Sequence, residues 1–189
     1  LTKSAQLPFS TWLYGAMVAP TPSSALLHSA TMVKAGVYLL IRLSPALYGT
    51  LTGAMVAFIG GFTFIAASMM AIAQNDAKKV LAFSTVSNLG LIVACAGISV
   101  EETVWAAILL MIFHSVSKSM LFEAVGATEN SIGSRDIEHM HGLILRLPRL
   151  AYIMGIGIAG MYLAPFGMLI SKWVALKSFV DSGNVILVI

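Results

Sequence analysis

The segment VWAAILLMIFHSVSKSMLFEAV, Val104 to Val125, is long enough to cross a bilayer as an α-helix, because about 20 apolar residues cover roughly 30 Å of hydrocarbon. Near its middle it carries His114 and Lys118, which lie four residues apart and therefore on one face of a helix. A charged side chain at that depth costs at least about 2.5–3.5 kcal/mol, so such residues normally face a bundle interior or a water-filled path. They either form a hydrogen-bonded pair that only holds helices together or handle protons and ions, and the second interpretation is favoured.

The composition of the whole chain agrees with a membrane location. Hydrophobic residues make up 58% of the 189 residues, charged residues 10%, and the mean hydropathy is +0.90. Soluble domains carry about 25% charged residues, so we expect an integral membrane protein with no nucleic-acid partner. Because the chain starts at Leu1 and stops inside the apolar run Val185–Ile189, we expect residues 1–189 to be a single transmembrane domain, a fragment of a longer polytopic protein. Cys95 is the only cysteine, which excludes an internal disulfide.

The apolar runs predict an all-α bundle of transmembrane helices. The expected spans are residues 1–17, 22–43, 52–73, 80–98, 104–125 and 150–181, with a further span starting at 185–189. Two of these spans contain helix breakers, Pro8 in the first and Pro165 with Gly167 in the last. Proline removes a backbone donor and kinks or ends a helix, and interrupted hydrophobic segments are typical of transport sites. We therefore predict non-helical breaks at both places.

Two of the spans carry no ionisable group. In 52–73 the small residues Gly53, Ala57 and Gly61 recur every fourth position, a spacing that lets membrane helices pack closely. The polar side chains of the 80–98 span are Ser84, Thr85, Ser87 and Asn88. These either line a hydrated path or form hydrogen bonds between helices, and the second role is the more frequent one.

The charges in the loops predict the orientation. The loops at 75–79 and 126–149 are separated by two spans, so they share a side of the membrane. Together they hold five basic residues, Lys78, Lys79, Arg135, Arg146 and Arg149. The opposite side has only Arg42, together with Glu101 and Glu102. By the positive-inside rule, the loops at 75–79 and 126–149 face the cytoplasm. We expect the protein to lie in the inner (cytoplasmic) membrane of the cell.

Several stretches resemble a known family. They are KSAQLPFSTWLYGAM, APTPSSALLHSATMVKAGVYLLIR, NDAKKVLAFSTVSNLG, HSVSKSMLF and FGMLISKW. They resemble the antiporter-like membrane subunits of respiratory complex I, of the multi-subunit sodium/proton antiporters and of the energy-converting hydrogenases, over nearly the whole chain. The pair SRDIEHMHGL and APFGMLISKW looks most like the hydrogenase-type branch. The resemblance implies an inverted-repeat fold, with two five-helix repeats that each contain a broken helix.

The resemblance also implies which residues carry protons. They are Lys3, His28, Lys34, His114, Lys118 and Lys172. Lys3 matches the lysine of the family's first broken helix, and Lys172 the terminal residue of its second. The family's glutamate that pairs with the first lysine lies upstream of this chain, and Trp173 follows Lys172 where many complex I subunits have an acid.

Elementary chemistry supports such a relay. Burial favours the neutral form of a lysine, so an intramembrane lysine can release and regain a proton, and histidine titrates near neutral pH. However, His28 and Lys34 are six residues apart, on different faces of a regular helix, so direct exchange between them requires water or a helix distortion. Glu123 points away from the face of His114 and Lys118. It is either an acid at the membrane interface or a partner of a neighbouring helix that tunes a lysine.

The sequence thus predicts translocation of protons, or of protons and a cation such as sodium, by a non-catalytic subunit of a redox-driven complex. Its partners would be other membrane subunits and the lipid bilayer. The alternatives are a subunit of a sodium/proton antiporter without redox coupling, a scaffold that moves no ions, and an enzyme that binds quinone. No cofactor is expected, because cysteine clusters, haem-attachment motifs and dinucleotide fingerprints are missing from the sequence. No metal is expected either, because His139 and His141 lack a structural zinc spacing.

Overall fold

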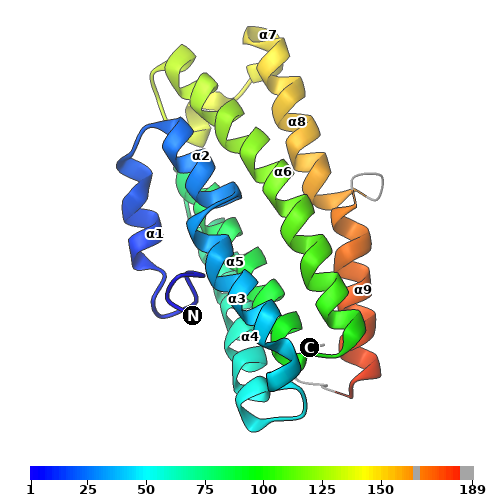
Figure 1. The fold of residues 1–189 in the computed structure, drawn as a ribbon. Coiled ribbons are helices and arrows are strands. Elements are labelled where there is room, and N and C mark those ends of the chain that lie inside the picture. Colours follow the sequence, from blue (N-terminus) through cyan, green and yellow to red (C-terminus); the bar gives the residue numbers. More distant parts are fainter. Residues whose placement is uncertain (164–166, 184–189) are drawn as a thin grey trace.

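The computed structural model describes residues 1–163 and 167–183. Within them the all-α prediction is confirmed: the regular structure is helical, and the only extended pairing is one isolated bridge between Asp76 and Asp136. The helices, seen in Figure 1, are α1 (Thr11–Gly15), η1 (Ala16–Val18), α2 (Thr21–Ser29), α3 (Met32–Leu47), α4 (Leu51–Ile72), α5 (Ala77–Ile98), α6 (Glu101–Ile132), η2 (Ile137–Met140), α7 (Leu143–Arg146), α8 (Pro148–Tyr162) and α9 (Met168–Asp181).

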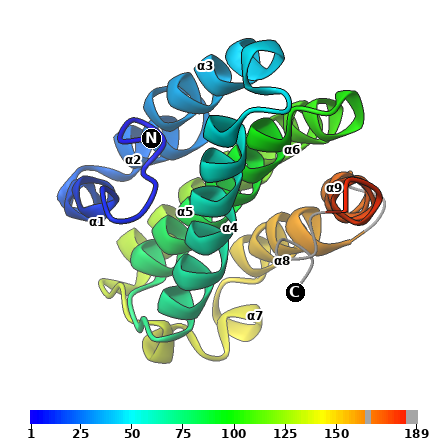
Figure 2. The ribbon, with the colours of Figure 1, turned by 90° about the horizontal axis from the view of Figure 1, so that it is seen from below.

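The helices α4, α5 and α6 form the middle of the bundle. Seen along the bundle in Figure 2, α2 and α3 lie on one side of them, and α8 and α9 on the other. Among the described residues, four segments are long and apolar enough to cross a membrane: Thr21–Leu47, which joins α2 and α3, and the helices α4, α5 and α6. In the apolar 18-residue stretch of α5, 83% of the residues are buried. A helix that is apolar all round is buried by its neighbours, so α5 is the core around which the others pack.

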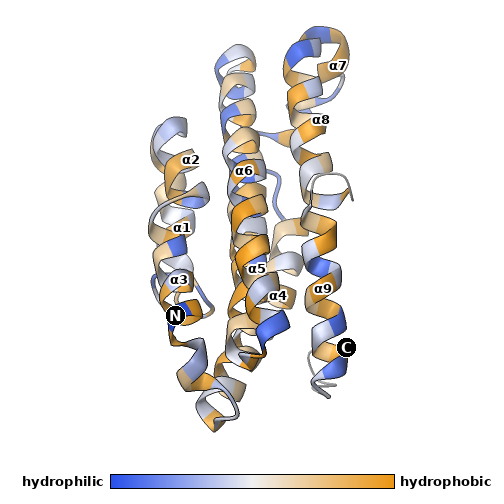
Figure 3. Ribbon diagram, turned by 45° about the vertical axis from the view of Figure 1, so that its right-hand side comes forward, coloured by the Kyte–Doolittle hydropathy of each residue, from blue (hydrophilic) through white to orange (hydrophobic). Residues whose placement is uncertain are grey.

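Apolar side chains also cover the outside of the bundle. Phe58, Phe62 and Ile65 of α4 are 57%, 58% and 53% exposed. Figure 3 colours much of the helical ribbon as hydrophobic, with hydrophilic residues near α7. Large contiguous apolar surfaces mark sites of membrane or protein contact. With four spanning segments, this surface identifies the chain as part of a multi-pass membrane protein.

The expected spans 80–98 and 104–125 lie within α5 and α6, and the expected span 52–73 coincides with α4 to within one residue at each end. The 22–43 span is represented by two helices, α2 and α3, rather than by one. The α6 helix extends beyond the predicted segment at both ends, because the polar residues that flank its apolar core continue the same helix. The predicted start of a further span at 185–189 lies outside the described residues.

The structure describes the first expected broken helix, residues 1–17, in full, but it describes the second, residues 150–181, only in part. Residues 1–17 do not form one long helix: turns run past Pro8 to Ser10, and the short α1 and η1 follow. In the 150–181 segment, α8 ends before Leu163, and α9 begins after Gly167, whose φ of +79° caps its amino end. Pro165 lies outside the described residues.

Small residues bring α4 and α5 into backbone contact. Gly53 and Ala57 are buried, as their spacing predicts, but the next buried position is Gly60, and Gly61 is only half-buried. The prediction was wrong by one residue because a helix repeats every 3.6 residues, so that a stripe of fours drifts off the interface. A Cβ on Gly60 would lie 2.6 Å from the Gly90 carbonyl oxygen, and one on Gly90 would lie 2.7 Å from the Gly60 oxygen.

The two basic loops meet at one end of the bundle. The Ile137 amide donates to Asn75 O at 2.9 Å, and a carboxylate on α6 joins the two loops. Lys78 Nζ lies 2.6 Å from Glu129 Oε2, and Arg135 Nε lies 2.5 Å from Glu129 Oε1. The arrangement places the 75–79 and 126–149 loops on the same side, as their separation by two spans predicts.

Candidate functional site

The α6 helix holds two ionisable side chains in the interior. His114 and Lys118 both have an exposed fraction of 0%. The helix is continuous through them, since the sequence from Val104 to Val125 contains no glycine or proline. The acids of its first turn suit the positive end of the helix dipole. The left-handed Gly133, with φ +78°, caps its carboxyl end. A rigid helix therefore fixes the height and direction of both groups.

Lys118 joins α6 to α5. Its Nζ donates to Leu81 O at 3.0 Å and also to Ser84 Oγ, at a shorter distance. Both acceptors belong to one turn of α5. Two oxygen acceptors stabilise a buried ammonium group, whereas a neutral amine needs fewer partners.

Lys34 joins α3 to α6. It is 6% exposed, and its Nζ donates to Met111 O at 2.5 Å and to Ser115 Oγ at 2.6 Å. Both partners lie within one turn of His114. Lys34 of α3 therefore bonds to α6 beside His114, and Lys118 lies four residues from His114 on α6 itself.

A break in the helix separates His28 from Lys34. The α2 helix ends at Ser29 and α3 begins at Met32, with non-helical backbone at Thr31 (φ −108°, ψ −92°). This is the kind of distortion that the six-residue spacing required. His28 itself is fully buried, and its ring lies 4.7 Å from the Phe122 ring of α6.

Neither buried histidine is used for structural hydrogen bonding. Both ring nitrogens of His28 and of His114 lack a partner within residues 1–163 and 167–183. Buried polar atoms normally have partners, and each exception requires an explanation. The geometry does not match a hydrogen-bonded His114–Lys118 pair that only fastens helices together.

Lys172 lines a cavity that is partly open to the outside of the bundle. Its Nζ lies 3.4 Å from Met161 O and 5.2 Å from the centre of the Tyr162 ring. The cavity has a volume of about 690 Å³ and is bounded by α4, α5, α6, α8 and α9, with η2 and α7 at one end. Ser84 and Asn88 of α5 line it as well. The cavity thus brings Lys172 to the same space as the serine that binds Lys118.

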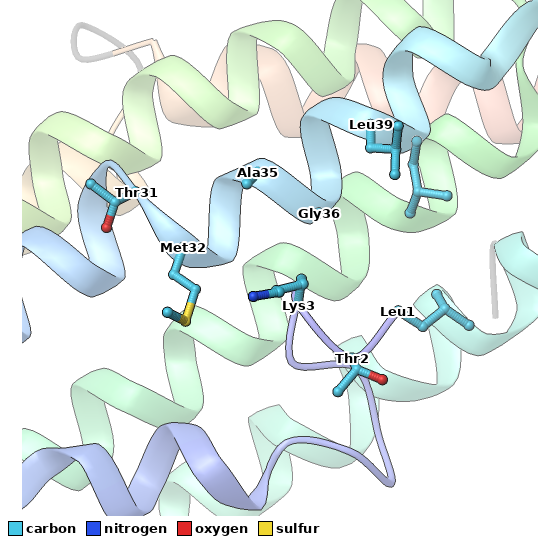
Figure 4. A pocket seen from close by; sticks show the side chains of 9 residues that line it. Leu1, Thr2, Lys3, Thr31, Met32, Ala35, Gly36 and Leu39 are labelled. Atoms are coloured by element: carbon cyan, nitrogen blue, oxygen red, sulfur yellow. The ribbon is translucent and has the colours of Figure 1, made fainter.

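Lys3 lies apart from this group. It is exposed, and it lines a separate pocket of about 770 Å³ between the first turn and α3. Figure 4 shows its side chain extending from the turn toward Met32 of α3. Gly36 permits this approach, because a Cβ there would lie 2.8 Å from the Ser4 amide nitrogen. Glu123 is exposed on α6, away from the buried face.

Sequence reasoning missed two features. It assigned Lys78 to a polar loop, but the side chain is 2% exposed and paired with Glu129. It also gave Ser115 no role, although this serine binds Lys34. The only signal for Ser115 was its place beside His114 in an otherwise apolar run. Nothing local pointed to the Lys78 pair, because Lys78 lies at the start of α5 and its partner Glu129 lies near the end of the next helix, α6.

The comparisons with known proteins agree with this geometry. The family profile described as NADH:quinone oxidoreductase/Mrp antiporter, TM, matches residues 1–189. Over 184 residues the chain is 43% identical to a Na(+)/H(+) antiporter subunit from Bacillus subtilis (strain 168), covering 90% of this chain and 23% of that protein. The chain thus spans about a quarter of the length of this relative.

Two solved structures have the same fold. The Mrp complex from Dietzia sp. DQ12-45-1b aligns with a TM-score of 0.88 and 40% identity, over 95% of this chain and 20% of that chain. The membrane-bound sulfane sulfur reductase, an archaeal respiratory membrane complex, aligns with a TM-score of 0.87 and 25% identity, over 99% of this chain and 39% of that chain.

Proposed function

This chain belongs to the NADH:quinone oxidoreductase/Mrp antiporter transmembrane family, and from that membership we propose that it is part of an ion-translocating subunit of a multi-subunit Na⁺/H⁺ antiporter. In this role, protons pass through the membrane along buried lysines and histidines, in exchange for sodium moved by the assembled complex. The chain performs no covalent chemistry itself. The proposal concerns the longer protein of which this sequence covers a part.

The relatives favour an antiporter over a redox-driven complex. From sequence alone the redox-driven complex was the main interpretation, with the hydrogenase-type branch as the closest match. The 43% and 40% identities, however, are to a Na⁺/H⁺ antiporter protein and to a chain of an Mrp complex, whereas the respiratory complex is 25% identical. We therefore adopt the interpretation without redox coupling.

The observation that supports translocation most strongly is the arrangement around α6. His114 and Lys118 are fully buried, and Lys34 binds α6 within a turn of His114. Intramembrane ionisable residues are expensive and commonly mark ion pathways. A packing role alone does not explain three buried ionisable groups together with His28, whose ring nitrogens have no hydrogen-bond partner among the described residues.

The proposed proton path includes residues of α2, α3, α6 and α9. Lys34 and His28 supply it from α3 and α2, His114 and Lys118 carry it through the centre, and Lys172 receives it. Lys3 begins a separate branch, which its own pocket connects with α3. Glu123 remains a candidate partner for a neighbouring helix. The partners are further membrane subunits, and the 75–79 and 126–149 loops face the cytoplasm from the inner membrane.

The test is Lys118→Met in the full-length protein, assembled in its complex. Methionine keeps much of the apolar stem and removes the ionisable group. Na⁺/H⁺ exchange is measured in inverted membrane vesicles with a pH-sensitive dye. We expect exchange to fall about a hundredfold, the scale of a lost proton-transfer group, while the amount of assembled complex stays normal.

Lys177→Met is the matched control, because Lys177 is an exposed lysine on α9. It should exchange at the rate of the unmodified complex. Normal exchange by Lys118→Met would eliminate the relay. If proton movement instead followed electron transfer from a respiratory donor and did not respond to sodium, the redox-driven interpretation would replace the antiporter.

A further inference from the structure

The hydroxyl of Ser84 is the contact between Lys118 and the cavity of Lys172. Lys118 is 0% exposed, and its Nζ donates to Ser84 Oγ. Ser84 is half-buried and lines the cavity of about 690 Å³ that Lys172 also lines. One side of this serine thus meets the central lysine, and the other meets the space in front of the terminal lysine.

We propose that Ser84 is a station of the proton path and passes protons between Lys118 and Lys172 through water in the cavity. This proposal rests on the proposed translocation function. The new proposal adds Ser84 of α5 to the lysines and histidines of the path, as the residue that connects Lys118 of α6 with Lys172 of α9.

A serine hydroxyl is suited to this step because it donates one hydrogen bond, accepts two and rotates freely. The N–H bond of the Lys118 ammonium breaks as Ser84 Oγ takes that proton. The hydroxyl's original proton leaves Oγ for a water molecule, and a water proton binds the neutral amine of Lys172. Ser84 ends as a neutral hydroxyl, Lys118 as an amine and Lys172 as an ammonium group.

The surroundings of Ser84 contain the groups that such a step requires. The Ser84 hydroxyl accepts a hydrogen bond from Lys118 and donates its own proton to Leu81 O at 3.0 Å, so it turns from this carbonyl toward the cavity when it passes its proton to water. One turn later, Asn88 donates to Ser84 O at 2.8 Å and lines the same cavity. Its Oδ1 is buried without a partner among the described residues. Most of the cavity lining is apolar, but Ser84, Asn88 and Lys172 all belong to it, and the buried amide oxygen is an acceptor for water beside them.

Charge argues that this space carries protons rather than sodium. The described lining of the cavity includes no carboxylate, and one of its members is a lysine. A sodium ion there would face the Lys172 side chain with only neutral oxygens as ligands. A proton that moves between the two amines adds no further charge.

The experiment compares two substitutions of similar shape. Ser84→Thr keeps the hydroxyl, and Ser84→Val replaces it with a methyl group. We expect Ser84→Val to lower Na⁺/H⁺ exchange in vesicles at least about tenfold, since the relay loses a proton-transfer group. Ser84→Thr should remain within about twofold of the unmodified complex, because the chemistry of the hydroxyl is unchanged.

Thr85→Val is the control within the same helix turn. The Thr85 hydroxyl also donates to Leu81 O, at 2.8 Å, but this residue is fully buried and does not belong to the described cavity lining. It should exchange normally. An equal loss in Thr85→Val and Ser84→Val, or normal exchange in Ser84→Val, would overturn the role of Ser84.

Lys118→Met, measured in parallel, separates the two proposals. If it abolishes exchange while Ser84→Val does not, translocation through Lys118 stands and the serine link is wrong. If both variants exchange normally, the relay itself is wrong.

Discussion

Lys34 of α3 extends across to α6 and donates to Ser115 Oγ at 2.6 Å. This contact lies beside His114 and fixes a lysine from one helix against the centre of another. Helix contacts built from side-chain hydrogen bonds in a membrane typically contribute about 0.6 kcal/mol. Such a contact is weak enough to open and close as the lysine gains and loses its proton.

Replacing Lys34 should therefore impair exchange more than replacing its partner. Lys34→Met removes the ionisable group, and we expect at least about a tenfold loss of Na⁺/H⁺ exchange with normal assembly. Ser115→Ala leaves Met111 O as an acceptor for Lys34, so its loss should be smaller. Dye-based exchange in inverted vesicles gives both rates. A larger loss in Ser115→Ala than in Lys34→Met would contradict the assignment.

The chemistry of Lys118 predicts that arginine cannot replace it. Arginine stays charged because its pKa is above 12, so it does not release a proton near neutral pH. Lys118→Arg should thus assemble with normal or reduced yield but exchange as poorly as Lys118→Met. The rates are measured per assembled complex, quantified by its protein content. A charge that only holds helices together would survive this substitution, and full exchange by Lys118→Arg would support that structural role.

The sequence predicts the long helices of this chain, but it does not predict the contacts between them. The helices α4, α5 and α6 were predicted because each apolar run is long and uninterrupted. The break at Thr31 was not, since neither proline nor glycine stands there and the backbone distortion depends on packing. The depth of His114 follows from its position in a span, whereas the partners of Lys34 and Lys118 lie on other helices. Local sequence carries no information on such distant contacts.

Close packing of α4 on α5 predicts an asymmetric response to added methyl groups. A Cβ on Gly90 would lie 2.7 Å from Gly60 O and from Phe64 N, both backbone atoms. Gly90→Ala should therefore lower stability by about 1–3 kcal/mol, the usual cost of overpacking. Gly155 on α8 has nothing within 4 Å of its Cβ position, so Gly155→Ala should be neutral or slightly stabilising. Thermal unfolding of the purified protein in detergent compares them, and equal midpoints would refute the predicted contact.

The orientation can be tested with single cysteines, in a background where the buried Cys95 is replaced by alanine. Leu145 is 88% exposed and lies in the 126–149 loop, and Tyr48 is 65% exposed at the opposite end of the bundle. The positive-inside rule predicts a cytoplasmic position for the first and an external one for the second. A membrane-impermeant maleimide should label Leu145→Cys in inverted vesicles and Tyr48→Cys in intact cells. The reverse pattern would invert the orientation.

The ion pairs of Glu129 with Lys78 and Arg135 predict that replacing Glu129 lowers stability more than replacing the exposed Arg135. Lys78 is 2% exposed and pairs with Glu129, which is 19% exposed, whereas Arg135 is 41% exposed. Glu129→Gln leaves the Lys78 ammonium buried without a carboxylate. Breaking a buried pair in this way costs about 3–5 kcal/mol, and we expect the lower end because Glu129 is partly solvated. Arg135→Gln should cost only about 0–1 kcal/mol, as exposed pairs do.

A double-mutant cycle isolates the Lys78–Glu129 contribution. In Lys78→Met the carboxylate keeps Arg135, so this variant should lose less stability than Glu129→Gln. The double variant Lys78→Met/Glu129→Gln has no buried unpaired ammonium, and it should therefore be more stable than Glu129→Gln alone. Midpoints of thermal unfolding in detergent supply the four corners of the cycle. If the two single losses simply add in the double variant, Lys78 and Glu129 do not act as a pair, because independent sites are additive and interacting ones are not.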